Sequence, residues 1–185
     1  LYEAKLFHQF THRWATYTDG GATRDATPDE LADPSFAVRP RYWVEKREVD
    51  AKLADKWDRQ WLLAWRDITN ATNERTCIAG VLPRTGAGNN APLFNPGSPT
   101  SAVPFLVGNL ASLAFDYAVR QKVGGSHLNF FVTYQLPVLP PDRYGAADRA
   151  FITPRVVELT YTAWDLRAFA ADMGMDGAPF RWDDD

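Results

Sequence analysis

An apolar, periodic stretch near residue 110 constrains the fold most strongly. Its apolar side chains recur every three or four residues, while Asn109, Ser112 and Asp116 fill the opposite face. This spacing predicts one long helix, because positions three and four apart share one face of an α-helix. Gly124 and Gly125 follow directly and are expected to end the helix with positive φ angles. The apolar positions are Val103, Leu106, Val107, Leu110, Leu113, Ala114 and Tyr117.

The rest of the chain alternates between β-favouring and helical patterns. The predicted fold is therefore α+β: a mixed or antiparallel sheet with the long apolar helix and C-terminal helices. Trp57, Trp61 and Trp65 also fit one helix face, so the strand at 61–69 has a helical alternative. We expect strands at 2–10 and 13–17 (a hairpin), 42–44, 61–69, 76–82 and 126–134, helices at 48–57 and within 155–173, loops at 19–40 and 83–101, and an irregular end at 182–185.

Length and composition predict a folded domain. A chain of 185 residues that is 45% hydrophobic can bury one sizeable core or two small ones. We expect one domain over residues 1–185, with residue 142 as the candidate for an internal sub-boundary. Leu1 stands where an initiator Met would be, which suggests a fragment of a longer polypeptide. Without a leader or an apolar run near twenty residues, the expected protein is cytoplasmic and spans no membrane.

Cysteine and histidine usage argues against disulfide and metal chemistry. Cys77 is the single cysteine, so no internal disulfide forms within the chain. His8, His12 and His127 do not combine with it into the spaced ligand set of a structural zinc site. We therefore expect neither a metal nor redox chemistry.

Charge is distributed unevenly. The formal net charge of −3 counts against nucleic-acid binding, because phosphate neutralisation by cations supplies much of that affinity. However, residues 39–84 carry ten Lys and Arg against seven Asp and Glu, whereas residues 1–38 carry three against six. A local basic strip can still bind DNA if the acids face away, with weak and salt-sensitive affinity.

A polar loop between two expected strands is the first candidate for contact with DNA. Arg66 and Arg75 bracket a run of Thr and Asn that includes Asn70 and Asn73. Asn can hydrogen-bond an adenine edge in both directions, and Arg can bind guanine or phosphate with two hydrogen bonds. The alternative is an ordinary turn in which Arg66 and Arg75 form surface ion pairs with neighbouring acids.

A glycine-containing loop is the second candidate. Gly86 and Gly88 would let backbone N–H groups approach a phosphate, with Arg84, Asn89 and Asn90 beside them. The pattern lacks the third glycine of a dinucleotide loop and the Gly-Lys-Ser/Thr end of a P-loop. An ordinary polar loop is the alternative interpretation.

The third candidate is the segment behind the apolar helix. Arg120 and Lys122 can meet phosphates, Gly124 and Gly125 allow close approach, and the donors His127 and Asn129 follow. Equally, Arg and Lys are favoured at a helix C-terminus by the helix dipole, and the glycines can serve as a cap. The neighbouring Phe130 and Phe131 are expected as one core ring and one partly buried ring.

Three stretches, residues 1–17, 61–90 and 120–141, carry a resemblance to a known family. The last contains RQKVGGSHLNFF followed by QLPVLPP. Together they resemble the target-recognition region of type IIG-like and defence-island N6-adenine DNA methyltransferases. In that family an upstream domain binds S-adenosylmethionine and flips adenine, while this region docks the duplex and selects the sequence.

The resemblance implies a DNA-binding module without its own catalysis or cofactor. Its partners would be double-stranded DNA and its own methyltransferase domain, and the parent could also carry an endonuclease. Pro140-Pro141 lacks the flanking Asn and Tyr of the adenine-methylation motif, which agrees with a non-catalytic fragment. The expected phosphate contacts are Arg66, Arg75, Arg84, Arg120 and Lys122, and the expected base contacts are Asn70, Asn73, Asn89 and Asn90.

Two other functions stay open from the sequence. Exposed aromatic residues could make the chain a docking module for its own methyltransferase domain. Asp29, followed later by Asp50 and Lys52, matches the PD-(D/E)xK pattern of metal-dependent nucleases. That pattern needs its second acid and its lysine on a strand, whereas residues 48–57 are expected to be helical.

Overall fold

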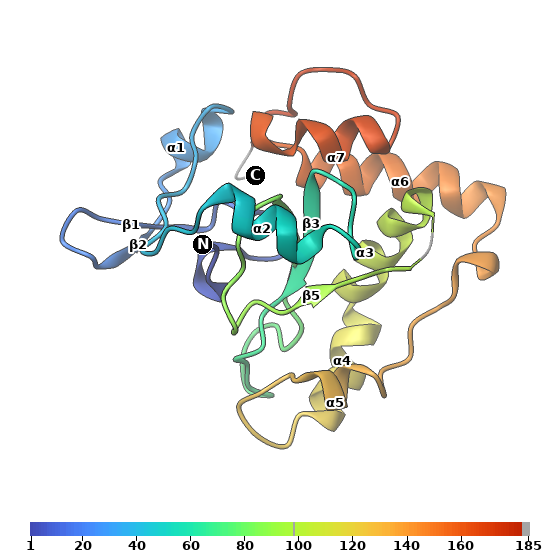
Figure 1. Cartoon of the computed structure of the whole chain (residues 1–185). Helices are drawn as coiled ribbons and strands as arrows, with labels where there is room; N and C mark the ends of the chain where they lie inside the picture. Colours follow the sequence, from blue (N-terminus) through green and yellow to red (C-terminus); the bar gives the residue numbers. More distant parts are fainter. Residues whose placement is uncertain (98, 183–185) are drawn as a thin grey trace.

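A three-stranded antiparallel sheet lies at the centre of the structure, a computed structural model that describes residues 1–97 and 99–182 (Figure 1). Strand β3 (Trp61–Trp65) is flanked by β4 (Ala79–Pro83) and by β5 (Leu93–Phe94). In the register, Leu63 lies opposite Val81 on one side and Phe94 on the other. The α+β class and the strands expected near 61–69 and 76–82 are confirmed.

Strand β3 divides the core into two clusters, because successive side chains point to opposite faces of a sheet. Trp61, Leu63 and Trp65 belong to a cluster built with the helices that follow the sheet. Leu62 and Ala64 belong to the other, built with the N-terminal segment. Both faces are therefore covered, and all five residues of β3 are buried.

The long apolar helix is two helices, α3 (Val103–Ala111) and α4 (Leu113–Lys122), bent by 64°. Ser112 has extended backbone angles, and its Oγ accepts a hydrogen bond from the Phe115 N–H, so it caps α4. The prediction of one helix was wrong because the apolar pattern continues across this break.

The bend also changes which face of α4 is buried. Phe115, Asp116 and Val119 point inward, whereas Leu113 and Tyr117 are 78% and 66% exposed. The expected apolar and polar faces of this part were therefore wrong.

The end of α4 differs from the expected glycine cap. Val123 caps the helix with a φ of −79°, and its N–H donates to the carbonyl of Val119. Neither Gly124 nor Gly125 has a positive φ, in contrast to Gly21, Gly97 and Gly174. The prediction of a positive-φ glycine cap was wrong.

The N-terminal region forms a different hairpin from the expected one. Residues Ala4–Leu6 are a 3-10 helix, and β1 (Ala15–Tyr17) pairs with β2 (Thr23–Asp25). Helix α1 (Pro28–Ala32) follows inside the expected loop and starts with a capping box. The strand predicted at 2–10 was wrong, because the buried Leu6 and Phe7 enter the core beside a 3-10 turn.

The remaining elements agree in part with the sequence. Helix α2 (Lys46–Leu53) overlaps the expected 48–57, while residues 42–44 form no strand. The region expected to be extended at 126–134 contains the short helix α5 (Phe130–Thr133). Of the irregular end expected at 182–185, residues 183–185 lie outside the described part. The other elements are the 3-10 turns Thr100–Ala102, Pro141–Arg143 and Trp164–Leu166 and the helices α6 (Ala146–Thr160) and α7 (Arg167–Asp172).

The C-terminal helices pack into the same core as the sheet. Helix α6 lies against α3 (Figure 1), and Val156 and Val157 join the cluster around Trp61 and Trp65. In the described part of the chain, no single helix has the length and apolarity needed to cross a membrane; α3 and α4 meet that criterion only as a bent pair.

Candidate nucleic-acid interface

Segments from all three candidate loops meet at one end of the central sheet, low in the view of Figure 1. Ile68 forms a β-bridge with His127, and the Leu128 N–H donates to the carbonyl of Asp67 at 2.7 Å. The Asp67 N–H donates in turn to the carbonyl of Asn90 at 3.1 Å. Loop 66–76, segment 123–129 and residues 89–90 therefore form one continuous surface region.

Eight of the predicted site residues are exposed around this region. We call them the candidate interface. Three of their side chains already make local contacts: Asn70 Oδ1 accepts the Thr72 N–H, Asn129 Oδ1 accepts the Val132 N–H, and His127 Nδ1 lies 2.7 Å from Asp67 Oδ2. The candidate interface consists of Asn70, Asn73, Asn89, Lys122, Gly124, Gly125, His127 and Asn129.

The side chains that are free to meet a ligand are few. Asn73, Asn89 and Lys122 form no side-chain hydrogen bond or ion pair with any other residue that the structure describes. Asn90 differs, because it is half-buried and its Oδ1 accepts the Ala4 N–H at 3.4 Å. The Asn90 side chain therefore lies against the N-terminal segment and is less accessible than the exposed amides of the candidate interface.

Arg120 holds loop 66–76 in place. Its guanidinium donates to the Asp116 carboxylate at 2.8 Å, to the carbonyl of Ala71 at 2.9 Å and to the carbonyl of Glu74. Those contacts occupy all three of its nitrogens. Arg120 is thus positioned as a support for the loop that carries Asn70 and Asn73.

Arg66 and Arg75 are used in the same way. The Arg66 guanidinium donates to the carbonyl of Phe7, and burial lowers its pKa to about 10. Arg75 donates to the carbonyl of Ala111 and lies 3.9 Å from the Asp116 carboxylate. Both guanidiniums satisfy backbone carbonyls of distant segments, so the alternative of surface ion pairs with neighbouring acids does not describe them.

Arg84 lies away from the candidate interface, toward the opposite end of the sheet. Its side chain is 10% exposed and binds the Asp50 carboxylate at 3.0 Å and the carbonyls of Trp57 and Arg59. Its backbone N–H donates to the carbonyl of Gln60, just before β3. Arg84 therefore joins α2 to the sheet.

The glycines beside Arg84 serve close packing. A Cβ on Gly86 would lie 2.5 Å from a methyl of Val44, and one on Gly88 would lie 3.2 Å from the carbonyl oxygen of Tyr2. The Gly88 N–H donates to that carbonyl at 2.6 Å. These contacts explain both glycines without a bound phosphate.

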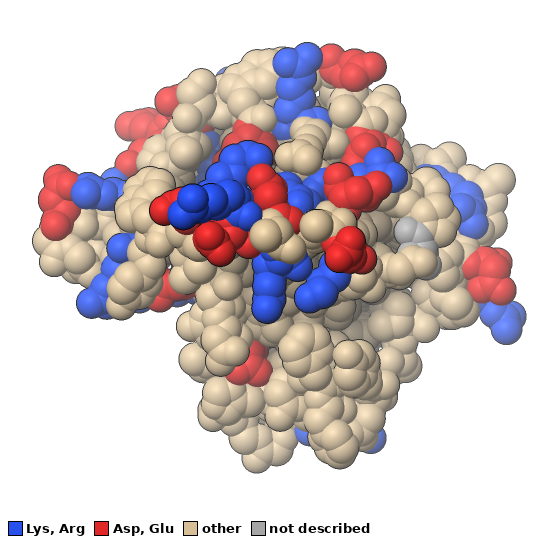
Figure 2. Space-filling view, viewed as in Figure 1, with Lys and Arg blue, Asp and Glu red and all other residues tan. Residues whose placement is uncertain are grey.

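Exposed aromatic rings surround the candidate interface. Phe131 is 75% and Tyr134 is 82% exposed, and Phe130 is 47% exposed and forms a T-shaped ring contact with Trp65. The expectation that one Phe enters the core was wrong, because Val132 and Leu136 of this segment pack there instead. Figure 2 shows this lower part of the molecule as mostly uncharged.

The basic stretch 39–84 does not form one cationic strip. Figure 2 shows Lys and Arg intermixed with Asp and Glu over the front of the molecule. Lys46 pairs with Asp50, and Arg47 lies beside Glu45 and Glu48. Arg66 and Arg75 lie elsewhere, near Phe7 and α3. Charge geometry thus gives no concentrated field to attract phosphates.

The nuclease pattern is spread over two helices. Asp29 lies on α1, whereas Asp50 and Lys52 lie on α2 in place of the strand that the pattern requires. Both oxygens of Asp50 are engaged, by Lys46 and Arg84. Among the described residues, no group of three His, Cys, Asp or Glu is placed to hold a metal ion.

His8 makes the N-terminal support of loop 66–76 sensitive to acid. Burial, together with Arg66, lowers the His8 pKa to about 4 from its ordinary 6.5. The folded state disfavours the charged form of the His8 ring. The contribution of the neutral ring to stability is therefore complete above pH 6.5 and is lost as the pH falls toward 4.

The wild-type chain should therefore lose on the order of 1 to 2 kcal/mol more unfolding free energy between pH 7 and pH 4 than a His8→Gln variant. Urea unfolding followed by tryptophan fluorescence at a series of pH values measures this difference. Parallel pH profiles for the two proteins would contradict it.

Comparison with known proteins adds no family assignment. No family model matches the chain, and no curated protein and no solved structure matches it either.

Proposed function

We propose that this chain is the DNA target-recognition domain of a larger cytoplasmic N6-adenine methyltransferase of a restriction-modification or phage-defence system. The convergence of three separately predicted loops at one end of the sheet carries this proposal. The resemblance of residues 1–17, 61–90 and 120–141 to such regions supports it. S-adenosylmethionine and the methyl-transfer chemistry belong to the parent's methyltransferase domain.

The arrangement assigns different roles to the predicted residues. Arg66, Arg75 and Arg120 fix the shape of the loops, since their guanidiniums are hydrogen-bonded within the protein. Lys122 supplies a phosphate contact, and the open space around Gly124 admits a DNA strand. The base edges are met by exposed amides and by the imidazole of the candidate interface, namely Asn70, Asn73, Asn89, Asn129 and His127.

Binding by the chain alone is expected to be weak. One free cation at the candidate interface, within the described structure, neutralises few phosphates, and the net charge of −3 opposes approach. The methyltransferase domain would supply most of the electrostatic attraction, and this chain the selection among sequences.

The exposed hydrophobic side chains favour a second candidate function. Leu113, Tyr117, Phe131 and Tyr134 are each at least 66% exposed on α4 and the α5 segment. Aromatic side chains are enriched at protein interfaces. In this alternative, the surface docks on the methyltransferase domain and DNA is bound elsewhere.

A salt titration tests the proposed DNA contact of Lys122. Replacing Lys122 by Ala should reduce the slope of log affinity against log salt by about 0.9, the value for one phosphate contact. Lys56→Ala is the matched control, since Lys56 is also exposed, lacks a side-chain partner among the described residues and carries the same charge. Fluorescence anisotropy with a pool of random duplexes measures both slopes.

Equal slopes for the two variants would contradict the phosphate contact. An Asn73→Ala variant should leave the slope unchanged and alter which duplexes are selected from the pool. If neither variant changed DNA binding while Phe131→Ser and Tyr134→Ser abolished association with the methyltransferase domain, the docking function would replace the proposed one.

A further inference from the structure

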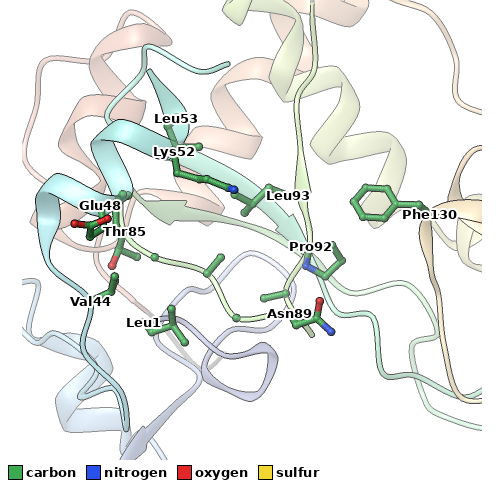
Figure 3. A pocket seen from close by; sticks show the side chains of 15 residues that line it. Leu1, Val44, Glu48, Lys52, Leu53, Thr85, Asn89, Pro92, Leu93 and Phe130 are labelled. Carbon is green, nitrogen blue, oxygen red and sulfur yellow. The ribbon is translucent and has the colours of Figure 1, made fainter. Parts of the chain in front are cut away.

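A cavity of about 490 Å³ lies between helix α2 and residues 85–93 (Figure 3). Its volume is within the range of about 300 to 1,000 Å³ that is typical of small-molecule sites. The walls are mainly apolar, from Val44, Val49 and Leu53 on one side and Leu93 on the other. Phe130 stands at one end, where the cavity meets the α5 segment.

A small number of polar groups face this apolar space. Lys52 extends from α2 toward Leu93, and Thr85 and Asn89 lie along the loop (Figure 3). Within the described chain, these three side chains have no hydrogen bond or ion pair. Glu48 also lines the cavity, with its carboxylate 3.4 Å from Arg47 Nε. An apolar volume with a few unused polar groups is the usual form of a ligand site.

The position of the cavity indicates which ligand it would meet. Asn89 belongs to the candidate interface, and Phe130 follows Asn129 of that interface directly, so the cavity opens beside the surface proposed to contact DNA. An aromatic ring offers a stacking surface for a base, an amide matches the donors and acceptors of a base edge, and an ammonium group suits a phosphate.

We propose that this cavity accepts a single nucleotide swung out of the bound duplex, a different nucleotide from the adenine that the methyltransferase domain would receive. The base lies in the apolar space against Phe130, Asn89 hydrogen-bonds its edge, and Lys52 contacts a phosphate. The inference rests on the proposed function, because the nucleotide comes from DNA held at the candidate interface. The cavity would thus give the chain a second way to select among DNA sequences, by accepting an extrahelical base.

Titration with dAMP tests the cavity without a duplex. In amide-resolved NMR, dAMP should shift the signals of residues around Thr85 to Leu93 and Phe130 in a saturable way. Lys52→Ala and Asn89→Ala should each weaken binding about fivefold or more, as expected for lost polar contacts. Lys56→Ala, outside the cavity, should bind dAMP like the wild type.

Three outcomes of this titration would overturn the proposal. They are unmoved cavity signals, equal weakening by Lys56→Ala and Lys52→Ala, and the same shifts with inorganic phosphate alone, which would show that no base is held. Each is independent of duplex binding, which Asn73→Ala and Lys122→Ala probe.

A duplex with a one-nucleotide bulge supplies the second test. The bulged nucleotide is already unstacked, so the cost of extruding it is largely removed. The wild type should bind this duplex about fivefold or more tightly than the fully paired one, and Lys52→Ala should remove the preference. Equal affinity of the wild type for both duplexes would refute the nucleotide pocket and leave DNA recognition standing, whereas no affinity for either would refute the proposed function.

Discussion

Replacing Arg13 by lysine should lower the free energy of unfolding by about 3 to 5 kcal/mol, which is a large fraction of the 5 to 15 kcal/mol typical of a domain. The Arg13 side chain is fully buried. One guanidinium nitrogen donates to the carbonyls of Leu31 and Thr162 at 2.8 and 3.0 Å, and another donates to that of Asp33 at 2.7 Å. It thereby joins the N-terminal segment, the region of α1 and the chain after α6.

The effect is expected because no other side chain can replace this geometry. A planar guanidinium reaches acceptors in several directions, whereas a lysine ammonium is a compact group that is strongly hydrated. After the substitution, several buried carbonyls lose their donor, and each such loss costs about 1 to 3 kcal/mol. Burial also lowers the pKa of Arg13, and the nearby Asp165 partly offsets that shift.

Urea unfolding at neutral pH measures the loss. Arg24→Lys is the matched control, since Arg24 is exposed and forms a surface ion pair with Glu30 at 2.6 Å. Its change should be much smaller, as is usual for surface ion pairs. If both substitutions shifted the midpoint equally, Arg13 would not be the internal connection that its contacts indicate.

The arginines show where sequence-based prediction stops. The sequence places Arg66, Arg75 and Arg120 in polar surroundings, where a guanidinium suits a phosphate as well as a carbonyl. Their actual acceptors include the backbone carbonyls of Phe7, Ala111 and Ala71. The sequence does not show which backbone carbonyl a side chain will bind, and here each carbonyl belongs to a distant segment. Only the folded structure shows whether such an arginine supports a loop of the protein or is free to contact DNA.

The strands expected near 61–69 and 76–82 were confirmed, whereas those expected at 2–10, 42–44 and 126–134 did not form. Residues 61–65 carry a continuous apolar run that suits a strand covered on both faces, and both faces are covered. The break at Ser112 was missed because the predicted apolar positions Leu110 and Leu113 continue on either side of it. Ser is a favoured N-cap residue, so the signal was present but weaker than the hydrophobic period.

The residues of the candidate interface were proposed from the sequence, but their meeting in one surface region was not. Loops rich in Asn and Gly are recognisable wherever they occur. Their meeting at one end of the sheet depends on the β-bridge between Ile68 and His127 and on the contact from Asp67 to Asn90. These are backbone contacts between distant segments, which a single sequence does not encode in its side-chain pattern. The exposure of Phe131 and Tyr134 depends on the same packing.

Replacing Asp116 by asparagine should also cost about 3 to 5 kcal/mol of unfolding free energy at neutral pH, the magnitude for breaking a buried charge pair. The buried Asp116 carboxylate accepts the N–H groups of Thr76 and Cys77, both at 2.8 Å, besides pairing with Arg120. An asparagine amide carries no charge to balance Arg120 and the nearby Arg75. The end of loop 66–76, at Thr76 and Cys77, would then lose the charged acceptor that Asp116 supplies from α4.

The pH dependence of this loss identifies its cause. Burial raises the pKa of Asp116, but hydrogen bonds from the Cys77 N–H, Arg120 and the Thr76 N–H together bring it below the ordinary 3.8. A lowered pKa stabilises the fold above 3.8, and this contribution disappears as the pH falls through the folded-state pKa. The stability difference between the wild type and Asp116→Asn should therefore shrink below pH 3.8.

Urea unfolding across the acid range, with amide hydrogen exchange at neutral pH, measures both parts of this prediction. Exchange in Asp116→Asn should rise most at the backbone amides of Thr76 and Cys77 and along the loop from Asn70. Asp142→Asn is the control, because Asp142 is exposed and its side chain has no partner in the described part of the chain. A difference that persisted unchanged into acid would mean that the Asp116 charge does not hold the loop. A rise in hydrogen exchange confined to loop 66–76 would instead show that the shape of the candidate interface depends on the buried Asp116 carboxylate.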